Sequence, residues 1–115
     1  MSKVRIYVSR DPKTGELHLR DSEGHEGDGS IITDVHHGDE VEWILGEGID
    51  EITCIRPASG SQNIFQGEIK KNGSGTWKGT IRESADGSEE YVIEYVAQNA
   101  RAQADRPRLR VKPPR

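Results

Sequence analysis

The sequence contains one cysteine, no long run of apolar residues and no stretch with the periodicity of an amphipathic helix. Because Cys54 has no second cysteine to pair with, a disulfide within the chain is excluded and nothing demands an oxidising compartment. A membrane-spanning helix needs about 18–20 apolar residues, and a secretory signal needs an apolar segment near its start. The sequence shows neither, so we expect a soluble, cytoplasmic protein.

Motifs for nucleotide binding and for catalysis are also missing. Neither the G-x-G-x-x-G pattern nor the Walker pattern of phosphate-binding loops occurs. A serine lies within Gly73–Gly75, but the helix that follows the nucleophile in a strand–turn–helix elbow is not predicted there. Glu47, Asp50 and Glu51 lie in a polar segment typical of solvated loops rather than of an acid–base pair. We therefore expect a non-enzyme with no catalytic residues and no cofactor.

Excess basic charge, the usual mark of nucleic-acid binding, is absent from the chain as a whole. Its 16 Lys and Arg residues against 20 Asp and Glu residues give a formal net charge of −4. This balance argues against a partner that is a nucleic acid or an anionic membrane. Basic residues do gather near the C-terminal end, which we interpret as the exposed face of a last strand and tail. They are Arg101, Arg106, Arg108, Arg110, Lys112 and Arg115.

What the sequence does contain is a two-residue alternation of apolar and polar side chains, which is typical of strands with one buried face. The alternating segments are residues 4–8, 17–19, 31–35, 40–45, 52–55, 77–81, 91–96 and 109–111. Turn residues separate them, as in Asp11–Gly15 and His36–Asp39. The pattern predicts an all-β fold, a Greek-key β-sandwich of seven to nine strands that forms a single domain over residues 1–115.

Two segments resemble the cupredoxin family of small Greek-key β-sandwiches. Val35–Trp43, with the sequence VHHGDEVEW, is similar to the family's apolar residue, short turn ending in Gly-Asp, and strand of alternating Val and aromatic residues. Within Gly87–Val111, YVIEYV resembles the family's penultimate strand and RLRV resembles the strand after its ligand loop. The resemblance implies a cupredoxin-like fold.

The same resemblance bears on type 1 copper, which the best-known members hold with two His, a Cys and usually a Met. Matched residue by residue, the ligand positions hold Glu51, Val96, Asn99 and Ala104. None of these side chains is the thiolate or imidazole that a blue-copper centre requires. The resemblance therefore implies a scaffold whose type 1 copper ligands are missing.

Two histidines and two tryptophans are the remaining candidates for binding. His36 and His37 are adjacent in a predicted turn and are the weak alternative as metal ligands, in which case the protein would bind copper. Trp43 and Trp77 lie in alternating strands, where large rings fill the space between two sheets. Trp77 has an alternative role, because small neighbours would let a sugar stack on its ring. We expect Cys54 to be a small buried apolar residue.

The function that these observations favour is a non-catalytic binding or interaction module. We expect it to bind a protein partner, or a second copy of itself, through sheet edges and through loops at one end of the sandwich. The predicted binding residues are Trp77, Glu51 and Asn99, and a metal carrier or a carbohydrate-binding module is the alternative. The loops are Asp21–Ser30, Gly46–Glu51, Ala58–Asn63 and Gln98–Asp105.

Overall fold

The structure is a computed structural model that describes residues 3–11, 13, 16–22, 24–27, 31–57, 64–67, 69–73, 75–82, 88–97, 102–105 and 107–111. Over these ranges the protein is all-β, as the alternation predicted, and no helix is present that could cross a membrane. The strands are β1 (Lys3–Arg10), β2 (Leu17–Asp21), β3 (Glu26–Gly27), β4 (Ile32–Val35), β5 (Glu40–Leu45), β6 (Ile49–Pro57), β7 (Lys70–Lys71), β8 (Trp77–Thr80), β9 (Ser88–Ala97), β10 (Ala102–Asp105) and β11 (Arg108–Val111).

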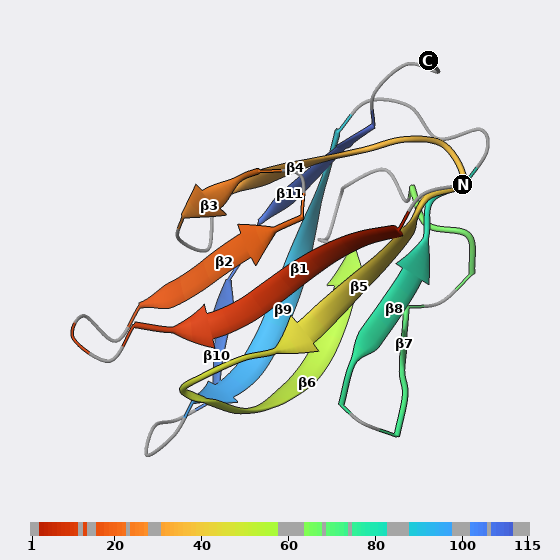
Figure 1. Cartoon of the computed structure of the whole chain (residues 1–115). Coiled ribbons are helices and arrows are strands. Elements are labelled where there is room, and N and C mark those ends of the chain that lie inside the picture. The colour runs from red at the N-terminus through yellow and green to blue at the C-terminus, as the bar shows by residue number, and fades with distance from the viewer. Residues whose placement is uncertain are drawn as a thin grey trace.

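The strands form two sheets that pack face to face. The first sheet has the order β3-β2-β1-β5-β8-β7, and the second has the order β10-β9-β11-β4 with β6 paired to the other edge of β9. Figure 1 shows the first sheet crossing in front of the long strand β9. The N-terminal half of the chain contributes to both sheets, because β4 pairs with β11 whereas β1, β2 and β5 lie in the first sheet.

The core lies between the two sheets and follows the predicted alternation. Val4, Ile6 and Val8 of β1 are buried, and the residues between them face outward. Trp43 is fully buried, as predicted; its indole N–H donates a hydrogen bond to the Tyr91 hydroxyl across 3.1 Å. The two rings meet nearly edge-on with centroids 5.4 Å apart. Burial raises the pKa of the Tyr91 hydroxyl, so this contact joins two neutral groups.

The turn at His36–Asp39 carries the chain from the second sheet to the first. The amide of Asp39 donates to the His36 carbonyl at 3.1 Å, and Gly38 has a φ of 78°, a value that glycine adopts without strain. The turn therefore forms where the sequence predicted it. It also delivers β5 into parallel pairing with β1, and β4 pairs in parallel with β11.

Several predicted boundaries were wrong. The described residues form eleven strands rather than seven to nine, because β3 and β7 are two-residue strands without any alternation to detect. β6 begins at Ile49 rather than at 52, so only the first part of the predicted Gly46–Glu51 loop is a turn. Likewise, the predicted loop Gln98–Asp105 contains β10. Residues 98–101 and the loop Ala58–Asn63 lie outside the described residues.

Cys54 is only partly buried, which corrects the prediction that it is a core residue. β6 pairs with β9 through two register shifts, one of them between Ile52 and Cys54. The shift places Cys54 opposite Glu94 on the outward side of the second sheet, because directly opposed residues of antiparallel strands share a face. The core positions of β6 are Ile49, Ile52 and Ile55, each three residues after the last.

Candidate functional site

An exposed apolar side chain lies on β4. Among the described strands, β4 is an end strand of the second sheet and pairs with β11 on one side. Ile32 in this strand is 41% exposed and is the one exposed large hydrophobic residue in the described ranges. Thr33 and Val35, on the other face of the strand, point into the core. β4 therefore presents an outward isoleucine beside an edge with which no other described strand pairs.

Three other edge strands, β3, β6 and β7, have protective features that β4 lacks. β3 and β7, at the two ends of the first sheet, are two residues long, and β7 consists of lysines. β6 is interrupted by two register shifts and ends at Pro57, which has no amide hydrogen to donate. Short length, lysine, bulges and proline are the features by which proteins prevent strand addition. Compared with β3, β6 and β7, the β4 edge is therefore the better place for an extended partner.

Directly behind this edge lies a polar group, here called the Asp21 cluster, which consists of Asp21, His25, Thr33 and Asp34. The side chain of Asp21 is fully buried at the end of β2. It accepts hydrogen bonds from the His25 amide at 2.9 Å and from the Thr33 hydroxyl at 2.6 Å. The contact with Thr33 joins the first sheet to β4 of the second sheet.

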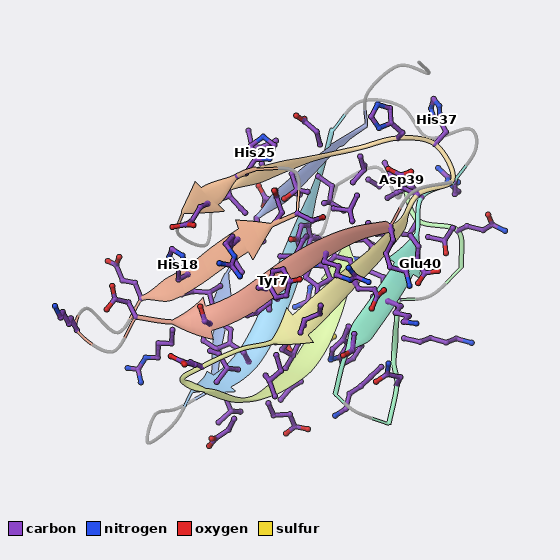
Figure 2. The ribbon with its side chains drawn as sticks, in the orientation of Figure 1. Tyr7, His18, His25, His37, Asp39 and Glu40 are labelled. Atoms are coloured by element: carbon purple, nitrogen blue, oxygen red, sulfur yellow. The ribbon has the colours of Figure 1, made fainter. Side chains whose placement is uncertain are left out.

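The imidazole of His25 lies between two carboxylates. Its Nδ1 is 3.0 Å from Oδ2 of Asp21, which is hydrogen-bonding distance. Its Nε2 is 3.7 Å from Oδ2 of Asp34, too long for a hydrogen bond. The His25 side chain is 36% exposed and that of Asp34 is 21% exposed. Figure 2 shows His25 beside β4, away from His37.

This cluster was not predicted from the sequence, although one signal for it was present. Asp21 continues the alternation of Leu17 and Leu19, so its position on β2 is an inward one. An acidic residue at an inward position needs buried donors, and Thr33 occupies an inward position on β4. The polar composition of the segment after residue 21 led instead to the prediction of a loop.

The predicted metal ligands His36 and His37 both lie in the turn before β5. The Nδ1 of His36 is 3.9 Å from Oδ2 of Asp39, and the same carboxylate oxygen accepts the His36 amide at 2.9 Å. His36 thus takes part in the local structure of the turn. Across the residues that the structure describes, no three His, Cys, Asp or Glu side chains are placed to hold one metal ion.

Trp77 and Glu51, two of the predicted binding residues, are brought to the same side of the sandwich. The indole N–H of Trp77 donates to the Ile52 carbonyl at 3.0 Å, and the ring is partly buried against the core. Glu51 is exposed and forms an ion pair with Lys71 at 3.0 Å. These contacts join β6 to β7 and β8, which is a structural role. Asn99, the third predicted binding residue, lies outside the described residues.

The positions at which the resemblance places copper ligands do not fit type 1 copper. Glu51 and Val96 are register partners on β6 and β9, and the carboxylate of Glu51 is paired with Lys71. Val96 and Ala104 offer no donor atom. Cys54, the one thiol, faces outward opposite Glu94 rather than occupying any of these positions. No step of copper chemistry follows from this arrangement.

The predicted binding loops do not gather at one end of the sandwich. The amide of Ser22 donates to the Arg5 carbonyl, which places the start of the predicted Asp21–Ser30 loop beside the first half of β1. The turn at residues 46–48 contacts the other end of β1, where the Arg10 amide donates to the Glu47 carbonyl. The reason is the antiparallel pairing of β1 and β2, which separates the start of β2 from its end.

A second charged cluster lies on the outer face of the first sheet. Glu42 of β5 has a side chain that is 12% exposed and forms an ion pair with Lys3 of β1 at 2.9 Å. The hydrogen bond from Lys3 lowers the pKa of the Glu42 carboxyl, against the effect of its partial burial. Glu40 lies between Lys3 at 3.9 Å and Lys78 at 3.7 Å. The cluster thus connects β1, β5 and β8.

Comparisons with known proteins give a similar fold and no family. No family model and no curated protein matches the sequence. Among solved structures, the chain is similar to the inclusion body protein PixA from Burkholderia cenocepacia J2315, with a TM-score of 0.61, 12% identity and 96% of each chain covered. The cysteine protease inhibitor EhICP2 from Entamoeba histolytica aligns with a TM-score of 0.43 and 9% identity, over 96% of this chain and 97% of that one. The likeness to PixA supports the all-β fold and says nothing of function.

Proposed function

We propose that the chain is a non-catalytic binding module that takes up an extended segment of a protein partner along the free edge of β4. One observation carries the proposal: Ile32, 41% exposed, stands on an end strand that lacks the protective features of β3, β6 and β7. Strand addition provides main-chain hydrogen bonds for affinity, and side-chain contacts on alternate residues provide specificity.

The chemistry of β4 indicates which segment would fit. Ile32 and Asp34 share the outward side of the strand, whereas Thr33 and Val35 face the core. Every second residue of an added strand would therefore lie on the same outward face as Ile32. An apolar or β-branched side chain directly opposite Ile32 would bury the isoleucine. The partner that we propose is a protein with an exposed, extended segment of β-branched residues. A second copy of this chain is the other source of such a strand.

We also propose that the sandwich is of the cupredoxin-like, Greek-key type, without copper. Two features support this assignment: the Gly-Asp turn that precedes β5, and the return of the C-terminal β11 to pair with the N-terminal β4. The solved structures to which the chain is similar are not described as cupredoxins. A cytoplasmic setting fits the single free Cys54.

Site-specific crosslinking tests the proposed edge. A photoreactive amino acid replaces Ile32 in one variant and, in another, the exposed Gln66, whose amide donates to the Thr80 carbonyl of β8 in the first sheet. Both variants are irradiated in lysate of the source organism, and crosslinked proteins are identified by mass spectrometry. The strongest candidate is then purified and titrated with the unaltered chain, with Ile32→Lys and with Gln66→Lys.

The proposal predicts a crosslink at position 32 that is absent at position 66. It also predicts that Ile32→Lys weakens binding of the purified partner at least about tenfold, since a charge on an edge strand opposes pairing. Gln66→Lys is expected to bind as the unaltered chain does. Equal crosslinking at both positions, or equal affinity of both lysine variants, contradicts the proposal. Sedimentation of the unaltered chain reveals whether the partner is a second copy.

A further inference from the structure

Three polar side chains lie together on the outer face of the first sheet, away from β4. They are Arg5 and Tyr7 of β1 and Arg20 of β2, here called the arginine face. Arg5 and Tyr7 alternate with the buried residues of β1, so both point away from the core. Arg20 is the register partner of Tyr7. Arg5 is therefore the diagonal neighbour of Arg20, a spacing that long side chains can bridge. Figure 2 shows Tyr7 near the middle of β1.

Arg5 faces a glutamate across the sheet, but that glutamate pairs with another cation. The register partner of Arg5 on β5 is Glu42, whose carboxylate lies 2.9 Å from the Lys3 ammonium. The pKa of Glu42 is lowered first by the hydrogen bond from Lys3 and least by the charge of Arg5. Within the residues that the structure describes, Arg5 forms no ion pair. Its exposed guanidinium is therefore available to an anion from outside the chain.

Arg20 also faces a glutamate that is directed elsewhere. Its register partner on β3 is Glu26, whose carboxylate lies 3.6 Å from the His18 ring. The Arg20 guanidinium instead lies over the Tyr7 ring, 5.1 Å from the ring centroid. Stacking of this kind uses the flat face of the guanidinium, whereas its N–H donors lie in its plane. The contact with Tyr7 thus orients Arg20 and leaves its donors available for hydrogen bonds.

An apolar side chain extends the arginine face on the side of β5. Ile44, the register partner of Tyr7 on β5, is half-buried and points outward. Arg20, Tyr7 and Ile44 therefore follow one another across β2, β1 and β5. A ligand that fits this row carries an anionic group beside an apolar one.

We propose that the arginine face binds an acidic segment of a protein partner, with one carboxylate or phosphoryl group held by both guanidinium groups. The planar donors of arginine match two oxygens of either group. The chain as a whole has a net charge of −4, so attraction of an acidic partner is confined to such a local patch. The site does not depend on strand addition at β4, which lies in the second sheet.

The charges around the arginine face favour an acidic peptide over a nucleic acid. A nucleic acid presents a long row of phosphates and needs several cations along its path. Glu26, Glu40 and Glu42 share the outer face of the first sheet with the two arginines and oppose such a polyanion. A short segment with one anion at the arginines avoids this repulsion.

The second sheet supplies a matched control in Arg56 of β6. Its side chain is 49% exposed, and its guanidinium pairs with the Glu94 carboxylate at 2.6 Å. Arg56 is thus an exposed arginine whose charge is already neutralised within the chain. If binding depends on the unpaired guanidinium groups of Arg5 and Arg20, loss of Arg56 will not weaken it.

The test is a fluorescence anisotropy titration of the full chain against labelled peptides of glutamate, leucine and proline. Proline opposes addition of the peptide as a strand at β4. A second peptide carries phosphoserine in place of one glutamate, and a third carries lysine in place of every glutamate. Arg5→Gln and Arg20→Gln are each expected to weaken binding of the acidic peptides at least about tenfold, because charge-assisted hydrogen bonds are lost. Arg56→Gln is expected to leave the affinity unchanged.

Arg20→Lys separates the geometry of the site from simple attraction of charge. It keeps the positive charge but loses the planar donors and the stacking, so its affinity should fall between those of Arg20→Gln and the unaltered chain. Circular dichroism verifies that each variant is folded. Binding of either acidic peptide with this pattern of variants supports the proposal, and the tighter of the two identifies the preferred anion.

Four results would overturn the proposal. The first is that the unaltered chain binds neither acidic peptide, or binds the lysine peptide as tightly. The second is an equal loss of affinity in Arg56→Gln and in the two arginine-face variants. The third is full affinity in Arg20→Lys, which would mean attraction of charge alone. The fourth is tighter binding of a single-stranded oligonucleotide that also depends on Arg5 and Arg20, which would make the partner a nucleic acid.

Discussion

The indole N–H of Trp77 in β8 donates a hydrogen bond to the main-chain oxygen of Ile52 in β6, 3.0 Å away, and so joins the two sheets at one side of the sandwich. At the opposite side, the hydroxyl of Thr33 in β4 donates to the carboxylate of Asp21 in β2 at 2.6 Å. A polar contact thus joins the two sheets at each side of the sandwich. The two contacts differ in burial, and their contributions to stability should differ accordingly.

Trp77→Phe should lower the free energy of unfolding by about 1–3 kcal/mol. The substitution keeps an aromatic ring but removes the hydrogen bond to Ile52 and part of the packed surface. Urea unfolding followed by circular dichroism measures the change. Trp43→Phe is the comparison and should cost more, because it leaves the buried hydroxyl of Tyr91 without its partner. Equal or greater loss in Trp77→Phe would contradict the assigned roles.

Asp21→Asn should destabilise the protein by about 1–3 kcal/mol, because the amide nitrogen replaces an acceptor oxygen where only donors face it. Those donors are the His25 amide, the His25 ring and the Thr33 hydroxyl. The exposed Asp50 is the matched control, and Asp50→Asn should stay within about 0.5 kcal/mol of the unaltered chain. Both values come from the same urea titration. Similar values for the two variants would mean that the Asp21 cluster does not hold the sheets together.

The sequence predicted most of the strands, because alternation directly records which side chains face the core. β1 and β9 formed where Val4–Val8 and Tyr91–Val96 alternate. The alternation did not predict β6 correctly, because register shifts break its two-residue period and its core residues Ile49, Ile52 and Ile55 are three apart. The parallel pairing of β1 with β5 could not be predicted from the alternation either, because it depends on which strands distant in the sequence become neighbours.

The candidate site was less predictable than the fold. The position of β4 at an end of its sheet is a property of the sheet order rather than of the local sequence. The contact between Asp21 and Thr33 joins two strands of different sheets and leaves no spacing signal. Trp77 was recognised as a core-strand residue, but its bond to Ile52 was not foreseeable from the alternation around it.

Gly48→Ala should destabilise the protein by about 1–3 kcal/mol, because Gly48 has a φ of 80°, where residues with a Cβ are strained. A Cβ there would also lie 3.0 Å from the Cβ of Arg10 and 3.1 Å from its carbonyl oxygen. Gly73 is the matched control, since a Cβ added to it meets nothing within 4 Å. Thermal unfolding of both alanine variants checks the prediction, and a Gly73→Ala loss as large as that of Gly48→Ala would refute it.

Glu42 should make folding stability depend on pH on the acid side. Its pKa is lowered from 4.5 in the folded protein, chiefly by the hydrogen bond from Lys3. A depressed folded pKa means that the unfolded chain takes up the proton first as the pH falls. The stabilisation is therefore fully present above the unfolded value and is lost as the pH falls through the folded one.

Glu42→Gln removes this titration, so its free energy of unfolding should lie below that of the unaltered chain at neutral pH and approach it in acid. Lys3→Met removes the same ion pair from the other side and should flatten the pH dependence in the same range. Urea unfolding of the three proteins between about pH 3 and pH 7 provides the comparison. Because the two substitutions delete one interaction, their effects should be less than additive in the double variant. Full additivity, or a pH dependence unchanged by Glu42→Gln, would show that the contact between β1 and β5 does not stabilise the fold.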